Sequence, residues 1–389
     1  MILTAQQLSN LDEESLREFL EHEAPEGYHL EYKIDFPGKS EQDRKRKFLR
    51  SITGFANAAG GHLILGVAEP NSVDSLDDRL QGIDRGQEHA HRYERIAASS
   101  VEPRIPGLRF EVVLLRTGRQ VILVNVPPSV SKPHMVILEG KREFFIRHSE
   151  STVPMSTHEI REAVFASASS GVRAREYLER FEQDAKVHVV REKHALLMQA
   201  MPLVPPDRPW PVLNSEMKNV LRGDRGSSHF STACAPAPTL EGIKAFEDRS
   251  VHNEWITEVH RNGYVSALVF SELEDDQEGR KRVFLNRYHC ILFNDFCGLC
   301  NRAIATAGTD SPYVVQCRYI NAHIAVLSGR RRWNNRVYAE SEPFGKEEIV
   351  WPEFFRSAGQ SFNDLAQEFC DLLFNAFGKE KSNWPPDTP

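Results

Sequence analysis

The sequence predicts an α+β protein with two domains, in which a mixed-sheet N-terminal domain is followed by a connector and a C-terminal α/β domain. Three consecutive patterns near the N-terminus carry this prediction. Apolar and charged residues alternate from Leu30 to Phe36, which is typical of a strand. Apolar residues then recur at helical spacing at Phe48, Ile52, Phe55 and Ala59. An almost unbroken apolar run follows at His62 to Val67, typical of a strand buried on both faces.

The flanking elements of the first domain can be read in order. Apolar residues at helical spacing predict a short amphipathic helix between Asp12 and His22. The helix that begins near Glu41 ends at Gly60-Gly61, because glycine adopts the left-handed conformation after a helix without strain. Further strands are predicted at 108–115, 120–126 and 143–148, with a helix at 91–99.

A capping box ends this first domain. Ser156 and Glu159 have the spacing of a reciprocal helix cap, which predicts a helix running to about Ala166. We therefore assign residues 1–167 to the first domain.

The rest of the chain is divided by composition. Residues 168–240 are predicted to be a connector, helix-prone over 172–200 and rich in proline between Pro202 and Pro238. Residues 241–389 form the C-terminal α/β domain, with strands expected at 264–270, 282–293 and 313–327. A final helix is expected at 362–377.

Charge and composition exclude some functions. The 48 Lys and Arg residues are outnumbered by 55 Asp and Glu, and the excess of acid is spread over both halves of the chain. A protein that coats nucleic acid by bulk electrostatics is thereby excluded, so contacts with nucleic acid must come from local patches. No apolar run has the length of a membrane span, so we expect no membrane partner. The acidic N-terminus and six scattered cysteines favour a cytoplasmic location.

A group of acidic residues and one lysine carries the chemical signal. Glu26, Glu31 and Lys33 form the pattern E-x4-E-x-K, and Glu31 and Lys33 share one face of the first strand. Glu69 follows the buried strand. If the two strands are neighbours, three carboxylates and one ammonium converge at a sheet edge. Such a group would bind Mg²⁺ or Mn²⁺ for phosphodiester cleavage. The alternative is a solvated strand face on which Glu and Lys simply alternate.

The motifs resemble those of the Schlafen AlbA domain family. The resemblance rests on the E-x4-E-Tyr32-Lys33 pattern, the run Gly54-Phe55-Ala56-Asn57-Ala58-Ala59-Gly60-Gly61-His62-Leu63-Ile64-Leu65-Gly66-Val67, and Phe144-Phe145-Ile146-Arg147. It implies a Schlafen AlbA-like mixed sheet over about residues 12–167. In the ribonuclease members, a metal-dependent acidic triad cleaves transfer and ribosomal RNA. Glu26, Glu31 and Glu69 match its positions, although the third is often Asp.

The resemblance also implies a functional context. The nuclease lobes of Schlafen proteins occur in pairs, and this chain has one copy, so a homodimer is expected to supply the second lobe. The leading expectation is a metal-dependent endoribonuclease that acts on structured RNA such as tRNA, in a stress or anti-phage role. Many prokaryotic members are described only as nucleic-acid-binding or ATP-binding proteins. A non-enzymatic nucleic-acid-binding regulator is therefore the alternative, and an interaction protein that only dimerises is a third.

Basic residues near the acidic group could contact RNA. Arg44, Lys45, Arg46, Lys47 and Arg50 lie at the start of the helix after the first strand, where they could bind phosphates. Basic residues near a helix N-terminus oppose its dipole, which mildly favours such a role. The alternative is a solvated helix face.

Three weaker signals have simpler structural explanations. A glycine helix cap explains Gly60-Gly61, because the sequence lacks the G-x-x-x-x-G-K-[ST] motif of a phosphate-binding loop. One set of histidine and cysteine residues could bind zinc, but buried free thiols are favoured because the spacing of the ligands is irregular. That set is His289, Cys290, Cys297, Cys300 and Cys317. An exposed turn with a structural tryptophan is favoured over single-strand stacking for Arg330-Arg331-Arg332-Trp333 with Arg336.

Overall fold

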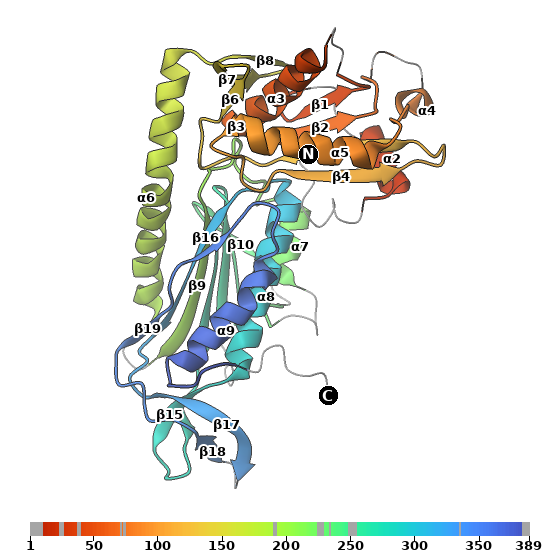
Figure 1. Cartoon of the computed structure of the whole chain (residues 1–389). Coiled ribbons are helices and arrows are strands. Elements are labelled where there is room, and N and C mark those ends of the chain that lie inside the picture. The colour runs from red at the N-terminus through yellow and green to blue at the C-terminus, as the bar shows by residue number, and fades with distance from the viewer. Residues whose placement is uncertain are drawn as a thin grey trace. The chain divides into compact units, whose positions relative to one another are not determined.

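The computed structural model describes residues 11–22, 27–36, 40–70, 72, 75–189, 193–223, 229–232, 235–247, 255–333 and 336–382 (Figure 1). The chain divides into two compact units, which we describe separately. The N-terminal unit is formed chiefly by residues up to Gly171, and the C-terminal unit chiefly by residues from Val172 onward. Helices and mixed sheets occur together, so the predicted α+β fold class is confirmed.

The N-terminal unit is built on a four-stranded sheet in the order β1-β2-β5-β4. Strand β1 (Leu30–Lys33) runs parallel to β2 (Gly61–Leu65). Strand β2 pairs antiparallel with β5 (Gln120–Val126), and β5 pairs antiparallel with β4 (Arg109–Leu114). The helix between β1 and β2 is the crossover that parallel neighbours require. This arrangement brings the carboxyl ends of β1 and β2 to the same edge of the sheet.

Helices cover both faces of this sheet. Helices α3 (Glu41–Asn57) and α5 (Gly86–Ser100) pack on one face, and α2 (Glu13–His22) and the short α4 (Leu76–Arg79) belong to the other. Every residue of β2 is buried, as the continuous apolar run predicted. Its side chains alternate between the two cores, so Leu63 and Leu65 face α3 while Ile64 faces α2.

A second sheet completes the unit. It has the order β3-β6-β7-β8 and consists of Val101–Glu102, Met135–Leu138, Lys141–His148 and Ser151–Pro154. Asn57, the last residue of α3, joins the helix to this region. Its side chain donates to the carbonyl oxygens of His134 (2.9 Å) and Phe145 (2.8 Å) and accepts from the His134 amide (2.6 Å). Gly60 then reverses the chain at a φ of 76°, which confirms the glycine cap.

Helix α6 (Thr157–His188) opens with the predicted capping box. The Glu159 amide donates to Ser156 Oγ (3.3 Å), and the Ser156 amide donates to Glu159 Oε2 (2.7 Å). The sequence predicts that this helix ends at about Ala166, but the helix continues to His188. Gly171 does not break it, because a single glycine inside a helix costs only about 1 kcal/mol.

The C-terminal unit is built on an eight-stranded antiparallel sheet with β9 (His194–Pro202) at its centre. The order is β10-β11-β12-β13-β9-β16-β19, and β20 also pairs with β16. The other strands are Ala237–Pro238 (β10), Gly242–Glu247 (β11), Trp255–His260 (β12), Val265–Ser271 (β13), Tyr313–Ile320 (β16), Glu348–Val350 (β19) and Phe354–Arg356 (β20). Strand β9 overlaps residues 172–200, for which the sequence predicted helix. All nine of its residues are buried, so tertiary packing overrides local helix propensity there.

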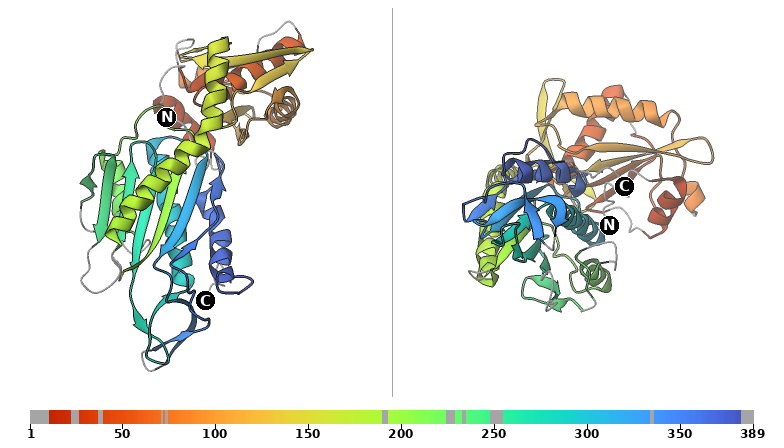
Figure 2. Two further views of the ribbon diagram at one scale, coloured as in Figure 1. Left: turned by 90° about the vertical axis from the view of Figure 1, so that its left-hand side faces the viewer. Right: turned by 90° about the horizontal axis from the view of Figure 1, so that it is seen from below.

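Helices cover both faces of the large sheet (Figure 2). Within the C-terminal unit, α6 lies across one face, where Leu178 and Phe181 pack against Met201, Tyr264 and Val314. The opposite face carries the largest core of the protein, with α7 (Ser215–Arg222), α8 (Arg287–Ala307) and α9 (Ala366–Asn375). A short 3₁₀ turn, Phe362–Leu365, precedes α9, so the predicted C-terminal helix is confirmed with a tighter first turn.

One predicted strand is part strand and part helix. The sequence predicted strand over 282–293, but β15 (Lys281–Leu285) ends before Asn286 and α8 begins at Arg287. The Asn286 side chain accepts from the Tyr288 amide (2.8 Å) and so starts the helix. Strand β15 belongs to a small sheet in the order β14-β15-β17-β18 with Glu274–Asp275 (β14), Ala325–Trp333 (β17) and Arg336–Ala339 (β18).

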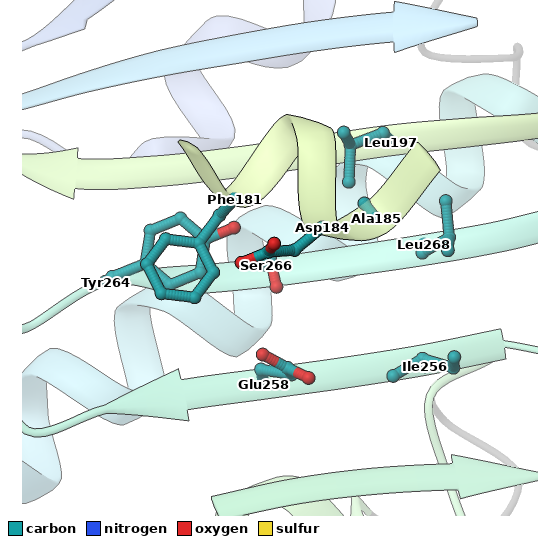
Figure 3. Close-up of a pocket in the computed structure, with 9 residues that line it drawn as sticks. All are labelled: Phe181, Asp184, Ala185, Leu197, Ile256, Glu258, Tyr264, Ser266 and Leu268. Atoms are coloured by element: carbon teal, nitrogen blue, oxygen red, sulfur yellow. The ribbon is translucent and has the colours of Figure 1, made fainter. Parts of the chain in front are cut away.

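Polar and aromatic side chains line a small cavity between α6 and the large sheet (Figure 3). Its volume is about 60 Å³. The rings of Phe181 and Tyr264 stack at one end with centroids 4.9 Å apart. The side chains of Asp184, Glu258 and Ser266 lie near the middle.

In the described part of the chain, no helix is long and apolar enough to cross a membrane.

Candidate functional site at the end of the first two strands

The parallel pairing of β1 and β2 brings Glu31, Lys33 and Glu69 together. Glu31 lies beside Leu63 and Lys33 beside Leu65, and the chain leaves β2 toward Glu69 at the same edge. The Lys33 Nζ atom lies 3.7 Å from Glu31 Oε1 and 3.5 Å from Glu69 Oε1. The condition on which the sequence argument depended, that the two strands are neighbours, is therefore met.

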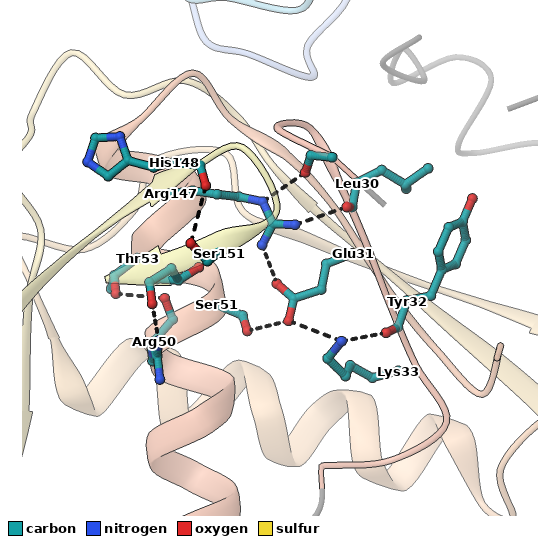
Figure 4. A network of polar contacts seen from close by, with 12 residues as sticks. Leu30, Glu31, Tyr32, Lys33, Arg50, Ser51, Thr53, Arg147, His148 and Ser151 are labelled. Atoms are coloured by element: carbon teal, nitrogen blue, oxygen red, sulfur yellow. Dashed lines mark hydrogen bonds and ion pairs between the residues drawn. The ribbon is translucent and has the colours of Figure 1, made fainter. Parts of the chain in front are cut away.

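Glu31 is a buried carboxylate and not part of a solvated face. Its side chain is only 11% exposed. The Arg147 guanidinium pairs with its Oε2 atom at 2.8 Å, and the Ser51 hydroxyl donates to its Oε1 atom at 3.1 Å (Figure 4). The alternative of a simple alternating surface strand is therefore wrong for this residue. A carboxylate is tolerated in such a place only when it is paired and hydrogen-bonded.

Arg147, from β7, is held almost without exposure to solvent. Its Nε atom donates to the Gly27 carbonyl (2.9 Å) and its Nη2 atom to the Leu30 carbonyl (3.1 Å). Its guanidinium also lies over the Phe55 ring, 4.6 Å from the centroid. The planar guanidinium, with its five donors, can satisfy several acceptors at once, which a lysine in this position could not do.

Lys33 and Glu69 form the accessible side of the site. The Lys33 side chain is 28% exposed and its ammonium also donates to the Tyr32 carbonyl (2.8 Å). Glu69 is 55% exposed and lies beyond the end of β2. A phosphate group approaching from solvent would therefore meet Lys33 and Glu69 before Glu31.

The charges of the described residues decide how well a divalent cation would fit. Two carboxylates, Glu31 and Glu69, are balanced by two cations, Lys33 and Arg147. No group of three His, Cys, Asp or Glu side chains suited to a metal ion occurs among the described residues. Glu26, the third predicted ligand, lies outside them. The described residues alone thus provide two carboxylate ligands and no excess negative charge.

His62, within this strand pair, is not available as a proton donor at neutral pH. Burial, with a smaller contribution from His29, lowers the pKa of His62 in β2 to about 3. His62 is therefore neutral at physiological pH and, being fully buried, out of contact with solvent.

The basic residues of α3 are largely engaged by the unit itself. Arg46 forms a two-pronged ion pair with Glu143 (2.5 and 3.1 Å), and Lys45 pairs with Glu41 (3.1 Å). Arg50 donates to the Thr152 carbonyl and lies over the Phe145 ring. Arg44 and Lys47 are exposed. These contacts support the solvated-face interpretation for Lys45, Arg46 and Arg50, and nucleic-acid binding by this helix stays a prediction.

The remaining sequence signals are structural where they can be seen. Among the described residues, the four cysteines considered for zinc binding are buried free thiols, namely Cys290, Cys297, Cys300 and Cys317. Cys370 is a further buried free thiol. Burial raises the pKa of the Cys297 and Cys317 thiols well above the usual value. The expectation of buried thiols is therefore confirmed. The side chains of residues 330–333 and 336 lie outside the described ones.

Sequence reasoning missed the two residues that hold Glu31. Arg147 stands at the end of the Phe-Phe-Ile-Arg run, and Ser51 belongs to no motif in the sequence. An arginine that directly follows three apolar residues of a strand is a signal for a buried ion pair. Its partner cannot be named from local patterns, because 116 residues separate Arg147 from Glu31.

Comparison with known proteins supports the domain assignment. Residues 26–156 match the family model described as Schlafen, AlbA_2, so the N-terminal unit contains a domain of this family. This family is consistent with a nucleic-acid-related role. No curated protein matches the sequence.

Comparison with solved structures gives several matches, among them one that covers only part of each chain. The chain is similar to the crystal structure of the DIP2311 protein from Corynebacterium diphtheriae, with 17% identity and a TM-score of 0.26. The match covers 41% of this chain and 28% of that one. A similarity this low carries no argument about function.

Proposed function

We propose that the N-terminal unit processes nucleic acid at the edge where β1 and β2 end, and that its activity is metal-dependent cleavage of structured RNA such as tRNA. One observation carries this proposal: Glu31 and Glu69, from different segments, both lie within ion-pair distance of the Lys33 ammonium. Carboxylates and one lysine at a sheet edge form the kind of group that phosphodiester hydrolysis uses.

Each residue has a distinct role in this proposal. Glu26, Glu31 and Glu69 would hold Mg²⁺ or Mn²⁺, which when bound polarises the phosphate and activates water. Lys33, half-buried between two carboxylates, would stabilise the negative charge that develops on the phosphate. Arg147 would hold Glu31 in one orientation and is a positioning residue.

Glu69 is the residue on which to test the proposal. Glu31 is unsuitable because its replacement would leave Arg147 buried without its partner. Glu69→Gln in the full-length chain changes an exposed side chain and should leave folding intact. We expect wild-type protein to cleave total tRNA with Mn²⁺ and not with EDTA, and Glu69→Gln to lose at least about 100-fold in rate.

Glu139→Gln is the matched control. Glu139 is an exposed carboxylate in the turn between β6 and β7, and its replacement should leave the rate unchanged. Cleavage by Glu69→Gln at the wild-type rate would reject the acidic site. Cleavage that persists in EDTA would show that the reaction does not need a divalent metal ion.

A non-enzymatic nucleic-acid-binding regulator is the second candidate. The observation that favours it is the balance of two carboxylates by two cations among the described residues, which weakens the attraction for a divalent cation. Binding of tRNA without cleavage under any metal condition would favour this role. If neither binding nor cleavage occurs, a protein-interaction role remains.

We further propose that a homodimer supplies the second lobe of the RNA-binding site and that the protein acts in the cytoplasm in stress or anti-phage defence. Light scattering at working concentration tests the assembly. A monomer that retains cleavage activity would reject the dimer.

A further inference from the structure

The strongest unassigned feature is a hollow on the surface of α5, the helix that packs beside α3. Its volume is about 510 Å³. It is lined by Arg85, Glu88, His89, His91, Arg92 and Arg95. Three guanidinium groups and two imidazoles therefore surround one carboxylate, in a chain whose overall charge is −7.

The helical spacing produces this concentration of basic groups. His89, Arg92 and Arg95 follow one another at intervals of three residues, so they form a row of neighbours on the surface of α5. Arg85 is the residue before the helix, has the left-handed conformation and lines the same hollow. The opposite side of α5 is anchored in the core by Ala90, Tyr93 and Ala97. The basic row is thus held on a rigid element and faces away from the core.

The guanidinium groups retain capacity for a ligand. Arg85 is 76% exposed and its contact with Glu88 is long, at 3.7 Å. Arg95 is exposed and has no hydrogen-bond or ion-pair partner among the described residues. Arg92 pairs with Glu41 at 2.6 Å yet is still 44% exposed. Arg85 and Arg95 thus differ from Arg46 and Arg50 of α3, whose donors are used by the unit itself.

Arg92 also connects α5 to the start of α3, through its ion pair with Glu41 (2.6 Å). Arg85, next to the first residue of α5, opposes the positive end of the helix dipole, an unfavourable arrangement that a bound anion would relieve.

We propose that this surface of α5, with Arg85, Arg92 and Arg95 as its principal contacts, binds the phosphate backbone of nucleic acid. The proposal rests on the proposed nucleic-acid function and supplies its binding surface. From Gly86 to Arg95 the helix rises about 13 Å, enough to pass several phosphates of one strand at about 3.4 Å per phosphate. A helix face of this kind reads charge and spacing and not base sequence.

Binding of a labelled tRNA to the full-length protein tests the proposal, with EDTA present so that cleavage does not interfere. The triple variant Arg85→Gln, Arg92→Gln, Arg95→Gln should bind at least about tenfold more weakly. Its slope of log affinity against log salt should fall by about 2 to 3, because each phosphate contact contributes about 0.9. Glu88→Gln should bind about two- to fivefold more tightly, a gain that misfolding cannot produce.

A matched triple variant controls for overall charge. Lys141→Gln, Arg142→Gln, Arg161→Gln removes three exposed positive charges that do not line the hollow. Equal losses in the two triple variants would overturn the proposal, as would wild-type affinity in the α5 variant. Competition by inorganic phosphate beyond that of chloride at equal ionic strength would assign the hollow to small phosphate ligands and also overturn it.

The outcomes separate this proposal from the proposed function. If the wild-type protein cleaves no RNA but the α5 variant loses RNA binding, the proposed endoribonuclease activity is rejected and the proposed binding surface on α5 is supported. If Glu69→Gln abolishes cleavage while the α5 variant binds normally, the reverse holds. A wild-type protein that binds no nucleic acid would overturn both.

Discussion

Arg147 and Glu31 form an ion pair of 2.8 Å that joins the two sheets of the N-terminal unit. Arg147 comes from β7 of the second sheet, and Glu31 comes from β1 of the first. The pair therefore performs a structural task at the same place where the acidic site is proposed. Glu31 of the E-x-K motif therefore has a structural role in addition to the catalytic role proposed for it.

Arg147→Met should destabilise the N-terminal unit strongly. The change leaves the Glu31 carboxylate buried without its partner, and breaking a buried pair in this way costs about 3–5 kcal/mol. Glu31→Gln combined with Arg147→Met should recover part of the loss, because no buried charge then remains. Urea unfolding followed by circular dichroism measures these effects.

The distribution of tryptophan separates the two units in that experiment. All five tryptophans lie at or beyond residue 210, so their fluorescence reports the C-terminal half alone. We expect Arg147→Met to shift the circular dichroism transition and leave the fluorescence transition in place. A loss of less than about 1 kcal/mol would show that Glu31 is better solvated than its contacts indicate.

Gly54→Ala should destabilise the protein even though alanine is the better helix former. A Cβ atom at Gly54 in α3 would lie 2.5 Å from Thr152 Cγ2 of β8, and both residues are buried. Overpacking of this kind costs about 1–3 kcal/mol, against a gain in helix propensity of about 1 kcal/mol. Thermal unfolding of the single variant and of Gly54→Ala with Thr152→Ala tests this. The double variant should be the more stable of the two.

Asn57→Leu should cost about 2–4 kcal/mol, because it leaves two carbonyl groups and one amide without the partner that Asn57 supplies. The expected loss is larger than for Asn125→Leu, since the buried amide nitrogen of the Asn125 side chain has no hydrogen-bond partner among the described residues. Urea unfolding by circular dichroism compares the two. Equal losses would mean that volume and not hydrogen bonding determines the effect.

His62 should make the N-terminal unit less stable in mild acid. In the unfolded chain His62 gains a proton as the pH falls through about 6.5, whereas burial keeps it neutral in the folded protein until about pH 3. Between these values the unfolded state binds more protons, so stability falls by about 1.4 kcal/mol per pH unit. His62→Gln should reduce this slope when urea unfolding is repeated at pH 7, 6 and 5. If the stability of His62→Gln depended on pH as steeply as that of the wild-type protein, His62 would not be the cause of the acid destabilisation.

Metal removal should not affect the cysteine-rich helix α8. Cys290, Cys297 and Cys300 are buried free thiols within a hydrophobic core. We expect EDTA to leave the tryptophan-detected melting temperature unchanged and a thiol reagent to reach these cysteines only after unfolding. A lower melting temperature in EDTA would contradict this expectation and support zinc binding by these cysteines.

The sequence was informative wherever local periodicity determines structure. The alternation of Glu31 and Lys33 on one strand face, the helix stripe through Phe48 and the buried run of β2 are local patterns, and each is present in the structure. The convergence of Glu31 with Glu69 could be anticipated because a helical crossover makes neighbouring strands parallel.

Long-range pairing could not be predicted in the same way. The burial of Glu31 depends on Arg147, which is distant in sequence and reaches it from another sheet. Residues 194–202 have a helix-compatible composition, yet their two hydrogen-bonded neighbours, β13 and β16, make them a central strand. Helix α8 has an apolar stripe at helical spacing, formed by Phe293, Phe296, Cys297 and Cys300. Because apolar strand residues come directly before it, the change from strand to helix at Asn286 could not be located from the pattern alone.

The central position of β9 has a consequence for how the chain folds as it is synthesised. Strand β9 leaves the ribosome first among the strands of the large sheet, while its partners begin only at Val265 and Tyr313. One hydrogen-bonding edge of β9 therefore stays open until Ser271 has been made, and the other until Ile320 has been made. Non-local pairing of this kind folds slowly and exposes apolar strands to aggregation. The N-terminal unit is formed chiefly by residues up to Gly171, so the nascent chain would carry a largely complete first unit and an unpaired apolar strand at the same time.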